Sequence, residues 1–222
     1  MSFLSKFLSL CSHMLWPVSC PVCGAAASLL CPDCLEYLLE KPQIPRCLHC
    51  GGPMPCRVHG EGAAVYAGAI YEGVMRDVIL RLKYGGLKAC GVLLGRGLGE
   101  CFENPGLDAL VPVPLHLDSP RRYNQTEEIA LGLGDVWGVP VWRAARWRSR
   151  SKTQESKGAA ARRALSSDAF EIDESVKGLR LALVDDVCTT GSTLARMAEA
   201  CRLKGARVVG AFVPAQTATA KE

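Results

Sequence analysis

Residues 181–193 read Leu-Ala-Leu-Val-Asp-Asp-Val-Cys-Thr-Thr-Gly-Ser-Thr. The apolar run at 181–184 has the length and composition of a fully buried strand, and the apolar spacing from 192 to 203 is typical of a helix. Two acids and a loop rich in hydroxyl groups therefore stand between the end of a strand and the start of a helix. This order predicts a βα unit that presents polar groups at the carboxyl end of a buried strand.

The loop in this unit has the composition of a phosphate site. Its hydroxyl-bearing residues are Thr189, Thr190, Ser192 and Thr193. Together with free main-chain N–H groups at a helix N-terminus they can hold a phosphate dianion, and Gly191 lets the main chain approach closely. Asp185 and Asp186 are suited instead to accept charge-assisted hydrogen bonds from the vicinal hydroxyls of a ribose. An acidic pair at a strand end can also bind Mg²⁺ or cap a helix, so an ordinary capped βα turn is the alternative.

The whole stretch resembles the phosphoribosyl pyrophosphate (PRPP) binding motif of type I phosphoribosyltransferases. The resemblance implies that the two acids form the catalytic pair and grip the ribose, that the loop grips the 5-phosphate, and that Mg²⁺ accompanies PRPP. The PRPP-binding residues that it implies are Asp185, Asp186, Val187, Cys188, Thr189, Thr190, Gly191, Ser192 and Thr193. Cys188 is either a reactive thiol at a helix N-terminus or a small spacer.

Three further segments narrow the resemblance. The Val-Pro-Val-Pro-Leu-His stretch at 111–116 and the Arg-Arg-Tyr-Asn-Gln-Thr-Glu stretch at 121–127 resemble segments of the competence protein ComF family. Tyr-Glu-Gly at 71–73, followed by Arg76 and by Leu-Lys-Tyr at 82–84, is similar to a third segment of that family. With the cysteine-rich N-terminus, the resemblance covers nearly the whole chain.

The same resemblance implies a pyrophosphate loop. In related transferases a loop at the carboxyl end of a strand receives the pyrophosphate. Its counterparts here follow the strand expected at Ala109–Val113 and are Val113, Pro114, Leu115 and His116. Arg121 and Arg122 lie close enough in sequence to supply positive charge to the diphosphate. The alternative is that both arginines are solvated residues at the start of a helix.

Residues 143–163 form the most basic stretch, with Trp142 just before it, Trp147 within it and Glu155 as its sole acid. In position the stretch matches the flexible loop that closes over PRPP in this fold. That match implies ligand contacts from Arg148, Arg150, Lys152, Thr153 and Gln154. A surface that binds and stacks on single-stranded DNA is a second interpretation, and a solvated loop without a partner is a third. The formal net charge of +4 is too small to decide between them.

Cysteine spacing predicts metal sites. Of 12 cysteines, eight fall within residues 11–56, and several form Cys-x-x-Cys pairs, which favours metal binding in a reducing cytosol over disulfides. The first expected Zn²⁺ site is Cys20, Cys23, Cys31 and Cys34, and the second is Cys47, Cys50, Cys56 and His59. An interleaved pairing of the same ligands stays open. We expect a structural role, because a segment of roughly 45 residues is too small to fold without a metal. Cys90, Cys101 and Cys201 fall in apolar helical patterns and are expected in the core.

Strand and helix patterns alternate from about residue 63. Strands are expected at Ala64–Tyr71, Ala109–Val113, Val139–Trp142, Arg180–Val184 and Arg207–Val213. Helices are expected at Leu35–Leu39, Gly73–Leu82, Val92–Phe102, Thr126–Trp137 and Gly191–Leu203. This alternation predicts an α/β fold with a mostly parallel sheet flanked by helices, which the resemblance identifies with the type I phosphoribosyltransferase fold. We expect a small zinc module with an N-terminal helix at residues 1–60 and the larger domain at 61–222.

The first nineteen residues have helical apolar spacing interrupted by polar residues. We expect an amphipathic helix that packs on the zinc module, with peripheral membrane attachment as the alternative. Because no apolar run approaches the roughly 18 residues of a membrane span, we expect no integral membrane segment.

The family resemblance implies a cytoplasmic DNA-processing factor of natural transformation. Such a protein would handle single-stranded DNA during DNA uptake, with competence and recombination proteins as partners, and its PRPP site would be regulatory or vestigial. The alternative is an active phosphoribosyltransferase that transfers ribose 5-phosphate from PRPP to a base or amine. A regulator whose nucleic-acid binding changes with PRPP is a third hypothesis. Whether the chain catalyses transfer, and whether it forms a homodimer, are left open by the sequence.

Overall fold

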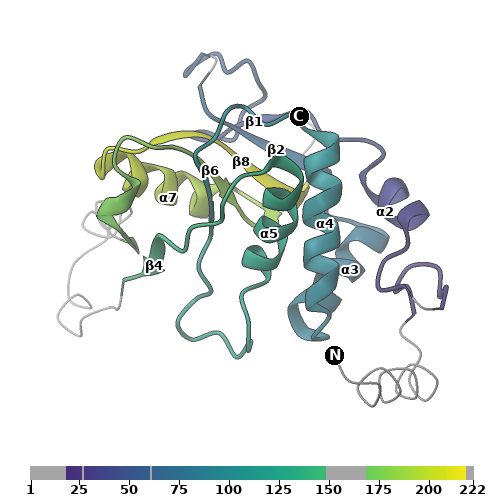
Figure 1. Cartoon of the computed structure of the whole chain (residues 1–222). Helices are drawn as coiled ribbons and strands as arrows, with labels where there is room; N and C mark the ends of the chain where they lie inside the picture. The colour runs from purple at the N-terminus through teal and green to yellow at the C-terminus, as the bar shows by residue number, and fades with distance from the viewer. Residues whose placement is uncertain (1–18, 27, 61, 149–168, 219–222) are drawn as a thin grey trace, which may run out of the picture.

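The computed structural model describes residues 19–26, 28–60, 62–148 and 169–218, and its main sheet has six strands. The strand order is β1 (Arg46–Cys47), β2 (Ala64–Ile70), β8 (Arg207–Gln216), β6 (Arg180–Val184) and β3 (Ala109–Pro112), and β7 (Val187–Cys188) pairs with β8 (Figure 1). All of these pairings are parallel except that of the edge strand β1 with β2. The prediction of an α/β fold with a mostly parallel sheet is confirmed.

Helices cover both faces of the sheet. The helices are α2 (Pro32–Leu39), α3 (Gly73–Tyr84), α4 (Lys88–Cys101), α5 (Gln125–Trp137) and α7 (Ser192–Leu203), with a short 3₁₀ turn η3 (Glu174–Val176). The first four pack against one face, and α7 packs against the other. A small antiparallel ribbon of β4 (Ala145–Trp147) and β5 (Phe170–Ile172) lies on the α7 side. The expected helix at the N-terminus falls almost wholly outside the described residues.

Two hydrophobic cores follow from the alternation of side chains along the buried strands. On β6, Ala182 and Val184 face the core under α3, α4 and α5, while Leu181 and Leu183 face the core under α7. All four are fully buried. Strands covered on both faces have continuous apolar sequences, which explains why residues 181–184 carry no polar alternation.

Glycines allow α4 and α5 to pack closely. A Cβ added at Gly95 would lie 2.0 Å from the carbonyl oxygen of Ile129, and one added at Gly132 would lie 1.9 Å from that of Val92. Any larger residue at either position would force the two helices apart. This contact fixes α5, whose first turn carries residues of the candidate site.

The expected strand at Val139–Trp142 is wrong. Val141 makes one isolated parallel bridge to Leu110 on β3, and no regular strand forms at 139–142. Pro140 accepts a hydrogen bond from the amide of Leu110 but has no N–H to donate to a ladder. The segment therefore follows the edge of the sheet without joining it as a strand.

Two of the three cysteines expected in the core are buried. Cys90 and Cys201 are 1% and 0% exposed, as predicted. Cys101 is exposed, which corrects the prediction for that residue. It is the last residue of α4, where the helical pattern ends and no longer implies burial.

Residues before 61 share both cores with the rest of the chain. Cys20, Cys34 and Leu38 are buried with α3, α4 and α5, and Leu48 is buried in the core under α7. The edge strand β1 also extends the main sheet. The cysteine-rich segment thus packs as part of the same body.

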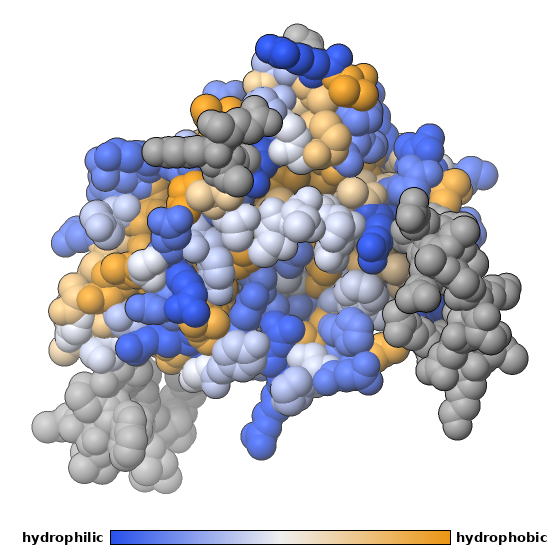
Figure 2. All heavy atoms as spheres, turned by 180° about the vertical axis from the view of Figure 1, so that it is seen from behind, coloured by the Kyte–Doolittle hydropathy of each residue, from blue (hydrophilic) through white to orange (hydrophobic). Residues whose placement is uncertain are grey.

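The surface carries scattered apolar side chains. Figure 2 shows hydrophilic and hydrophobic residues interspersed over the face seen from behind. The most exposed large apolar residues include Val58, Ile44 and Tyr84. Among the described helices, none combines the length and the hydropathy needed to cross a bilayer.

Candidate functional site

The candidate site lies where β3 and β6 end side by side. The amide of Val113 donates to the carbonyl oxygen of Val184 at 2.8 Å, so the segments that follow the two strands start as neighbours. From β3 the chain enters α5 on one face, and from β6 it enters α7 on the opposite face. Such a reversal opens a crevice outside the carboxyl ends of the strands, which is the usual ligand position in open α/β sheets.

The loop before α7 presents free main-chain donors. Gly191 is the N-cap residue and adopts a left-handed conformation with φ of 74°, and none of the described side chains caps the helix. The amide of Ser192 donates to Oγ1 of Thr190 at 3.3 Å. The other amides of the first turn are left to an external acceptor, and the helix dipole favours an anion there.

A small hollow lies directly over this helix end. Its lining residues are Asp185, Val187, Cys188, Thr189, Gly191, Ser192, Thr193 and Leu194. The structure therefore brings together most of the residues expected to bind PRPP. Asp186 and Thr190 belong to the same stretch but do not line the hollow.

Asp186 is engaged by the protein itself. Its side chain is 7% exposed, Lys83 Nζ lies 2.9 Å from Oδ1, and Gln125 Nε2 donates to Oδ2 at 2.5 Å. Lys83 comes from the last turn of α3 and Gln125 from the first turn of α5. Asp186 therefore ties two helices to the end of β6, whereas Asp185 faces the hollow.

The negative charge on the carboxyl group of Asp185 is disfavoured by its surroundings. Burial and the adjacent charge of Asp186 raise the pKa of Asp185, against smaller opposing effects of the Asp186 amide, Lys83 and Arg121. The amide of Asp186 donates to its Oδ1 at 2.8 Å. Hydroxyl donors or a cation brought by a ligand would offset the cost of its negative charge.

Arg121 and Arg122 occupy different environments. Arg122 is exposed, whereas Arg121 is partly buried and its charge acts on Asp185. Arg121 Nε donates to Ser119 Oγ at 3.0 Å. Its Nη1 is buried without a hydrogen-bond partner among the described residues. A buried guanidinium nitrogen without an acceptor is costly, and an anionic ligand would supply one.

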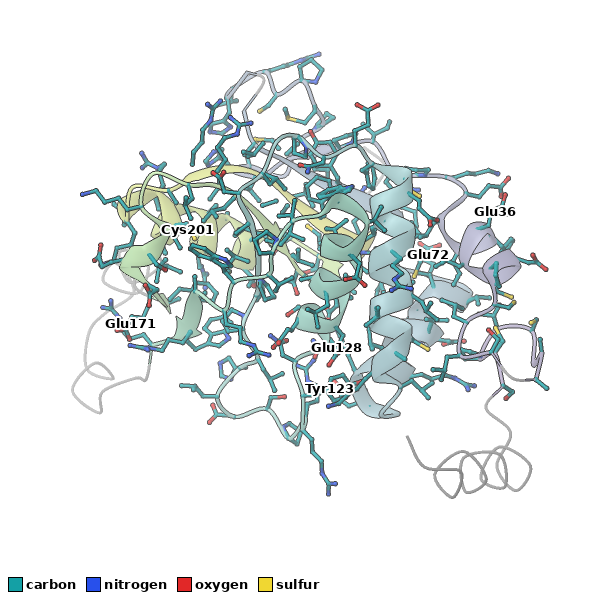
Figure 3. The ribbon with its side chains drawn as sticks, viewed as in Figure 1. Glu36, Glu72, Tyr123, Glu128, Glu171 and Cys201 are labelled. Carbon is teal, nitrogen blue, oxygen red and sulfur yellow. The ribbon has the colours of Figure 1, made fainter. Side chains whose placement is uncertain are left out.

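The start of α5 braces the segment after β3. Asn124 Nδ2 and Thr126 Oγ1 both donate to the carbonyl oxygen of Val113, at 3.0 and 2.5 Å. The Tyr123 hydroxyl donates to the carbonyl oxygen of Leu82 near the end of α3, and Figure 3 labels Tyr123 on the chain leading into α5. The stretch at 121–127 thus holds the site together from several sides.

The expected pyrophosphate segment runs outward from the sheet. Val113 is buried, Pro114 and Leu115 are partly buried, and His116 is exposed. The indole Nε1 of Trp147 donates to the carbonyl oxygen of Pro114 at 2.8 Å. The segment is therefore anchored at its base and open at its tip.

The described part of the basic stretch is largely ion-paired. Arg143 pairs with Glu127, and both Nε and Nη2 of Arg146 bind Glu171, labelled in Figure 3. The main-chain amide of Arg148 donates a hydrogen bond to the carbonyl oxygen of Ala169 at 2.9 Å. The other residues expected to act in the flexible loop, which are Arg150, Lys152, Thr153 and Gln154, lie outside the described residues.

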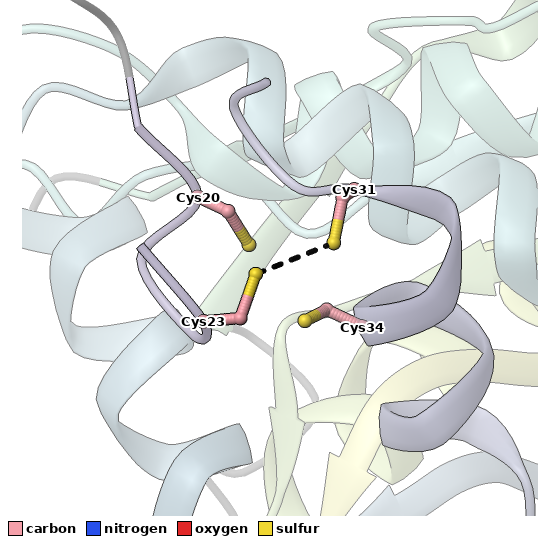
Figure 4. Close-up of side chains that lie close together, drawn as sticks. All are labelled: Cys20, Cys23, Cys31 and Cys34. Atoms are coloured by element: carbon pink, nitrogen blue, oxygen red, sulfur yellow. Dashed lines mark hydrogen bonds between the residues drawn. The ribbon is translucent and has the colours of Figure 1, made fainter. Parts of the chain in front are cut away.

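The first cysteine group forms a four-sulfur cluster. Cys20, Cys23, Cys31 and Cys34 point toward a common centre in Figure 4, and their sulfurs lie within 4.8 Å of one another. The Sγ atoms of Cys23 and Cys31 are 3.6 Å apart. A tetrahedral Zn²⁺ with Zn–S bonds of about 2.3 Å requires sulfur separations of about 3.8 Å, so the group fits such an ion.

The second group combines three sulfurs and one imidazole. Cys50 and Cys56 Sγ atoms are 3.5 Å apart, and His59 Nδ1 lies 3.5 Å from the sulfurs of both Cys47 and Cys56. These separations also fit a tetrahedral ion, whose sulfur to nitrogen edge is about 3.5 Å. The main-chain amides of His59 and Val58 lower the pKa of Cys56 to about 6, which favours the thiolate that binds metals. The ligands therefore group in sequence order, not interleaved.

Three side chains that contact the candidate site are not predicted by the sequence pattern: Lys83, Gln125 and Trp147. Lys83 and Gln125 lie in segments that carry the family resemblance, but neither was assigned a role there. Trp147 was noted only as an aromatic residue in a basic stretch. An apolar helix that ends in a lysine beside the sheet was the available signal for Lys83.

The chain is similar in sequence to several known proteins. No model of a known protein family matches it. The chain is 27% identical over 202 residues to DNA utilization protein YhgH of Salmonella typhi, covering 86% of this chain and 80% of that protein. It is 28% identical over 210 residues to the protein of the same name from Escherichia coli O6:H1 (strain CFT073), covering 86% of each.

Two solved structures are also similar. One is described as the allosteric regulatory enzyme of purine biosynthesis, with a TM-score of 0.44, and the other as glutamine PRPP amidotransferase from B. subtilis complexed with ADP and GMP, with a TM-score of 0.45. Both are 22% identical and match 57% of this chain. This chain spans about a quarter of their length, since 26% of each is covered.

Proposed function

We propose that this chain binds PRPP with Mg²⁺ at the shared carboxyl edge of β3 and β6. The observation that carries the proposal is that Asp185 and the uncapped N-terminus of α7 line one hollow. The carboxylate can accept hydrogen bonds from ribose hydroxyls, and the helix N-terminus can donate hydrogen bonds to a phosphate. The two groups lie side by side and therefore fit a phosphorylated ribose.

Each part of the ligand has a proposed partner. The loop at 189–193 takes the 5-phosphate, and Asp185 takes the ribose hydroxyls. Arg121, through its buried Nη1, and the segment at 113–116 take the diphosphate. Asp186 acts as a positioning residue, because Lys83 and Gln125 already engage its two oxygens. Mg²⁺ would screen the diphosphate charge in this arrangement.

The wider role that we propose is in DNA utilization in the cytoplasm. The relatives named for DNA utilization and the resemblance to the ComF family support it. Zn²⁺ is the proposed occupant of both cysteine groups, and their reduced thiols suit a reducing compartment. Competence and recombination proteins are the proposed partners.

Binding of PRPP is tested by calorimetric titration. Wild-type protein should bind PRPP with Mg²⁺ saturably, and Asp185→Asn should lose most of that affinity. Asp135→Asn is the matched control, because Asp135 is an exposed aspartate that pairs with Arg96 on the α4–α5 surface. Absence of binding by the wild type would refute the proposal, as would equal binding by wild type and Asp185→Asn.

Single-stranded DNA is the second candidate ligand, favoured by the name of the relatives and by the basic stretch. Fluorescence anisotropy with a labelled oligonucleotide, with and without PRPP, would test it. Replacing Arg148, Arg150 and Lys152 with Gln should weaken binding and flatten its salt dependence. An unchanged salt slope would remove this stretch from DNA binding. Release of pyrophosphate in the presence of a base or amine would instead support the transferase alternative.

A further inference from the structure

The second cysteine group lies on an extension of the main sheet. Its ligand Cys47 is the last residue of β1, which pairs with β2. The next residue, Leu48, is 2% exposed and packs in the core under α7. In Figure 1 the loop that follows β1 rises at the top of the molecule, above the sheet. One side of this metal centre is thereby anchored to the main sheet, whose strands β3 and β6 carry the proposed PRPP site.

The knuckle of this group, the turn from Cys47 to Cys50, lies close to the phosphate loop. Gly51 follows the ligand Cys50 and adopts a left-handed conformation with φ of 73°. A Cβ built on Gly51 would lie 3.8 Å from the carbonyl oxygen of Thr190, so the knuckle passes close to the loop with room for little more than one added carbon. The Gly51 amide donates to the carbonyl oxygen of Cys47 at 2.8 Å. The turn that brings Cys47 and Cys50 together therefore lies close to the loop at 189–193.

A second connection starts beside Cys47. Arg46 Nη2 donates to the carbonyl oxygen of Thr217 at 2.5 Å. Thr217 in turn donates to the loop, through its amide to the carbonyl oxygen of Cys188 at 3.0 Å and through Oγ1 to that of Thr189 at 3.3 Å. Arg46, next to the ligand Cys47, is thus connected to Cys188 and Thr189 by hydrogen bonds through Thr217, and Gly51, next to the ligand Cys50, lies close to Thr190.

The first cysteine group has different neighbours. Cys20 and Cys34 pack with α3, α4 and α5, and Leu29 beside this group accepts a hydrogen bond from Cys90 on α4. Figure 1 shows this segment and α2 at the right of the molecule, whereas the loop that follows β1 lies at the top. The two groups therefore provide a comparison within one chain, since among the described residues only the second group has a hydrogen-bonded connection, through Arg46 and Thr217, to the phosphate loop.

We propose that a metal ion held by Cys47, Cys50, Cys56 and His59 fixes the loop at 189–193 in its ligand-binding form. This inference rests on the proposed binding of PRPP and assigns control of that site to the second metal centre. Without the ion, the four ligands are no longer joined, and the knuckle and Arg46 lose the positions from which they restrain residues 188–190. A loop that spends less time in the competent form binds its ligand more weakly in proportion to that fraction.

Two matched variants test the proposal. Cys23→Ala and Cys50→Ala each remove an exposed ligand, one from each group. Metal content is measured for both, followed by hydrogen exchange of the amides at 189–194 without ligand, and by titration with PRPP and Mg²⁺. Cys50→Ala should show faster exchange at 189–194 and at least about fivefold weaker PRPP binding. Cys23→Ala should lose the other metal and keep wild-type values in both measurements.

The proposal is overturned if Cys50→Ala loses its metal while hydrogen exchange at 189–194 and the affinity for PRPP stay unchanged. It is also overturned if Cys23→Ala changes both measurements as much as Cys50→Ala does. Should Cys50→Ala fail to fold, Thr217→Val replaces it, because that variant removes the contact to Thr189 and leaves all four ligands in place. Thr217→Val should then show the faster exchange, and wild-type exchange in it would also overturn the proposal. If the wild type binds no PRPP, the proposed function fails, and the exchange measurements still decide the metal dependence of the loop.

Discussion

The indole nitrogen of Trp147 donates a hydrogen bond to the main-chain oxygen of Pro114 at 2.8 Å. The Trp147 ring also lies 5.1 Å from that of His116 and 4.3 Å from that of Phe170, measured between ring centroids. Trp147 ends β4 and Phe170 begins β5. The ribbon on the α7 side therefore contacts the segment that we expect to receive the pyrophosphate.

Trp147 should report ligand binding. Addition of PRPP with Mg²⁺ should change tryptophan emission in the wild type and in Trp137→Phe, but much less in Trp147→Phe. Trp137 is a suitable control because its indole donates to the carbonyl oxygens of Gly99 and Phe102 at the end of α4. Loss of one hydrogen bond, worth about 0.5–1.5 kcal/mol, should weaken PRPP binding in Trp147→Phe by roughly two- to tenfold. An undiminished emission change in Trp147→Phe would contradict the assignment.

Arg121 and Arg122 should differ in their effect on PRPP affinity. Arg121→Ala should weaken binding by roughly 10- to 100-fold, because hydrogen bonds to charged groups contribute about 1.5–3 kcal/mol. Arg122→Ala removes the exposed neighbouring arginine, and its affinity for PRPP should stay within about twofold of the wild-type value. Calorimetric titration of both variants against PRPP and against ribose 5-phosphate measures the difference. Equal losses in the two variants would favour general attraction of the anion over a specific contact from Arg121.

The ion pair between Lys83 and Asp186 should be important for stability. Lys83→Met leaves Asp186 with Gln125 as its remaining side-chain partner, and a buried charge deprived of its partner costs about 3–5 kcal/mol. Since Lys83 is 20% exposed, we expect a loss below this range, about 2–3 kcal/mol in the free energy of unfolding.

A double-mutant cycle measured by urea unfolding tests this pair. Lys83→Met combined with Asp186→Asn should be less destabilised than the sum of the single variants, because the unpaired charge is then removed. Additive effects would mean that the two groups do not interact. Arg96→Met with Asp135→Asn, on an exposed ion pair, is the matched control and should couple by less than about 1 kcal/mol.

The sequence predicted the location of the site better than the roles within it. Residues 113–116 and 185–193 were expected at one edge because both follow buried strands, and the parallel pairing of β3 with β6 places them there. The different roles of Asp185 and Asp186 could not be predicted. They depend on a hydrogen bond between residues 61 positions apart, and no local pattern encodes such a contact.

Two features of the fold, the strand β1 and the absence of a regular strand at 139–142, could not be predicted from the sequence for physical reasons. The strand β1 has only two residues, Arg46 and Cys47, so it shows no alternation that could have separated it from a zinc knuckle. The apolar segment at 139–142 has the composition of a strand, but Pro140 removes one ladder donor. In both cases pairing with the rest of the sheet, not local composition, decides the structure.

Asp185→Asn should stabilise the protein in a manner that depends on pH. Burial and the charge of Asp186 raise the pKa of Asp185 above its ordinary value of 3.8. Between 3.8 and the raised value, the folded protein therefore binds a proton at Asp185 more tightly than the unfolded chain does. Stability contributed by this proton is present at low pH and is lost as the pH rises through that window.

Asparagine carries no charge, so the variant avoids this loss. Its gain over the wild type should be near zero at pH 4 and should grow to about 1 kcal/mol or more at pH 8, equivalent to a rise of roughly 2–4 °C in Tm. The Asn oxygen can still accept from the amide of residue 186, which keeps the local hydrogen bond. Thermal unfolding at several pH values, with Asp135→Asn as the exposed control, measures the effect. A gain independent of pH, or a loss of stability at pH 8, would show that the Asp185 carboxylate carries no such cost in the folded protein.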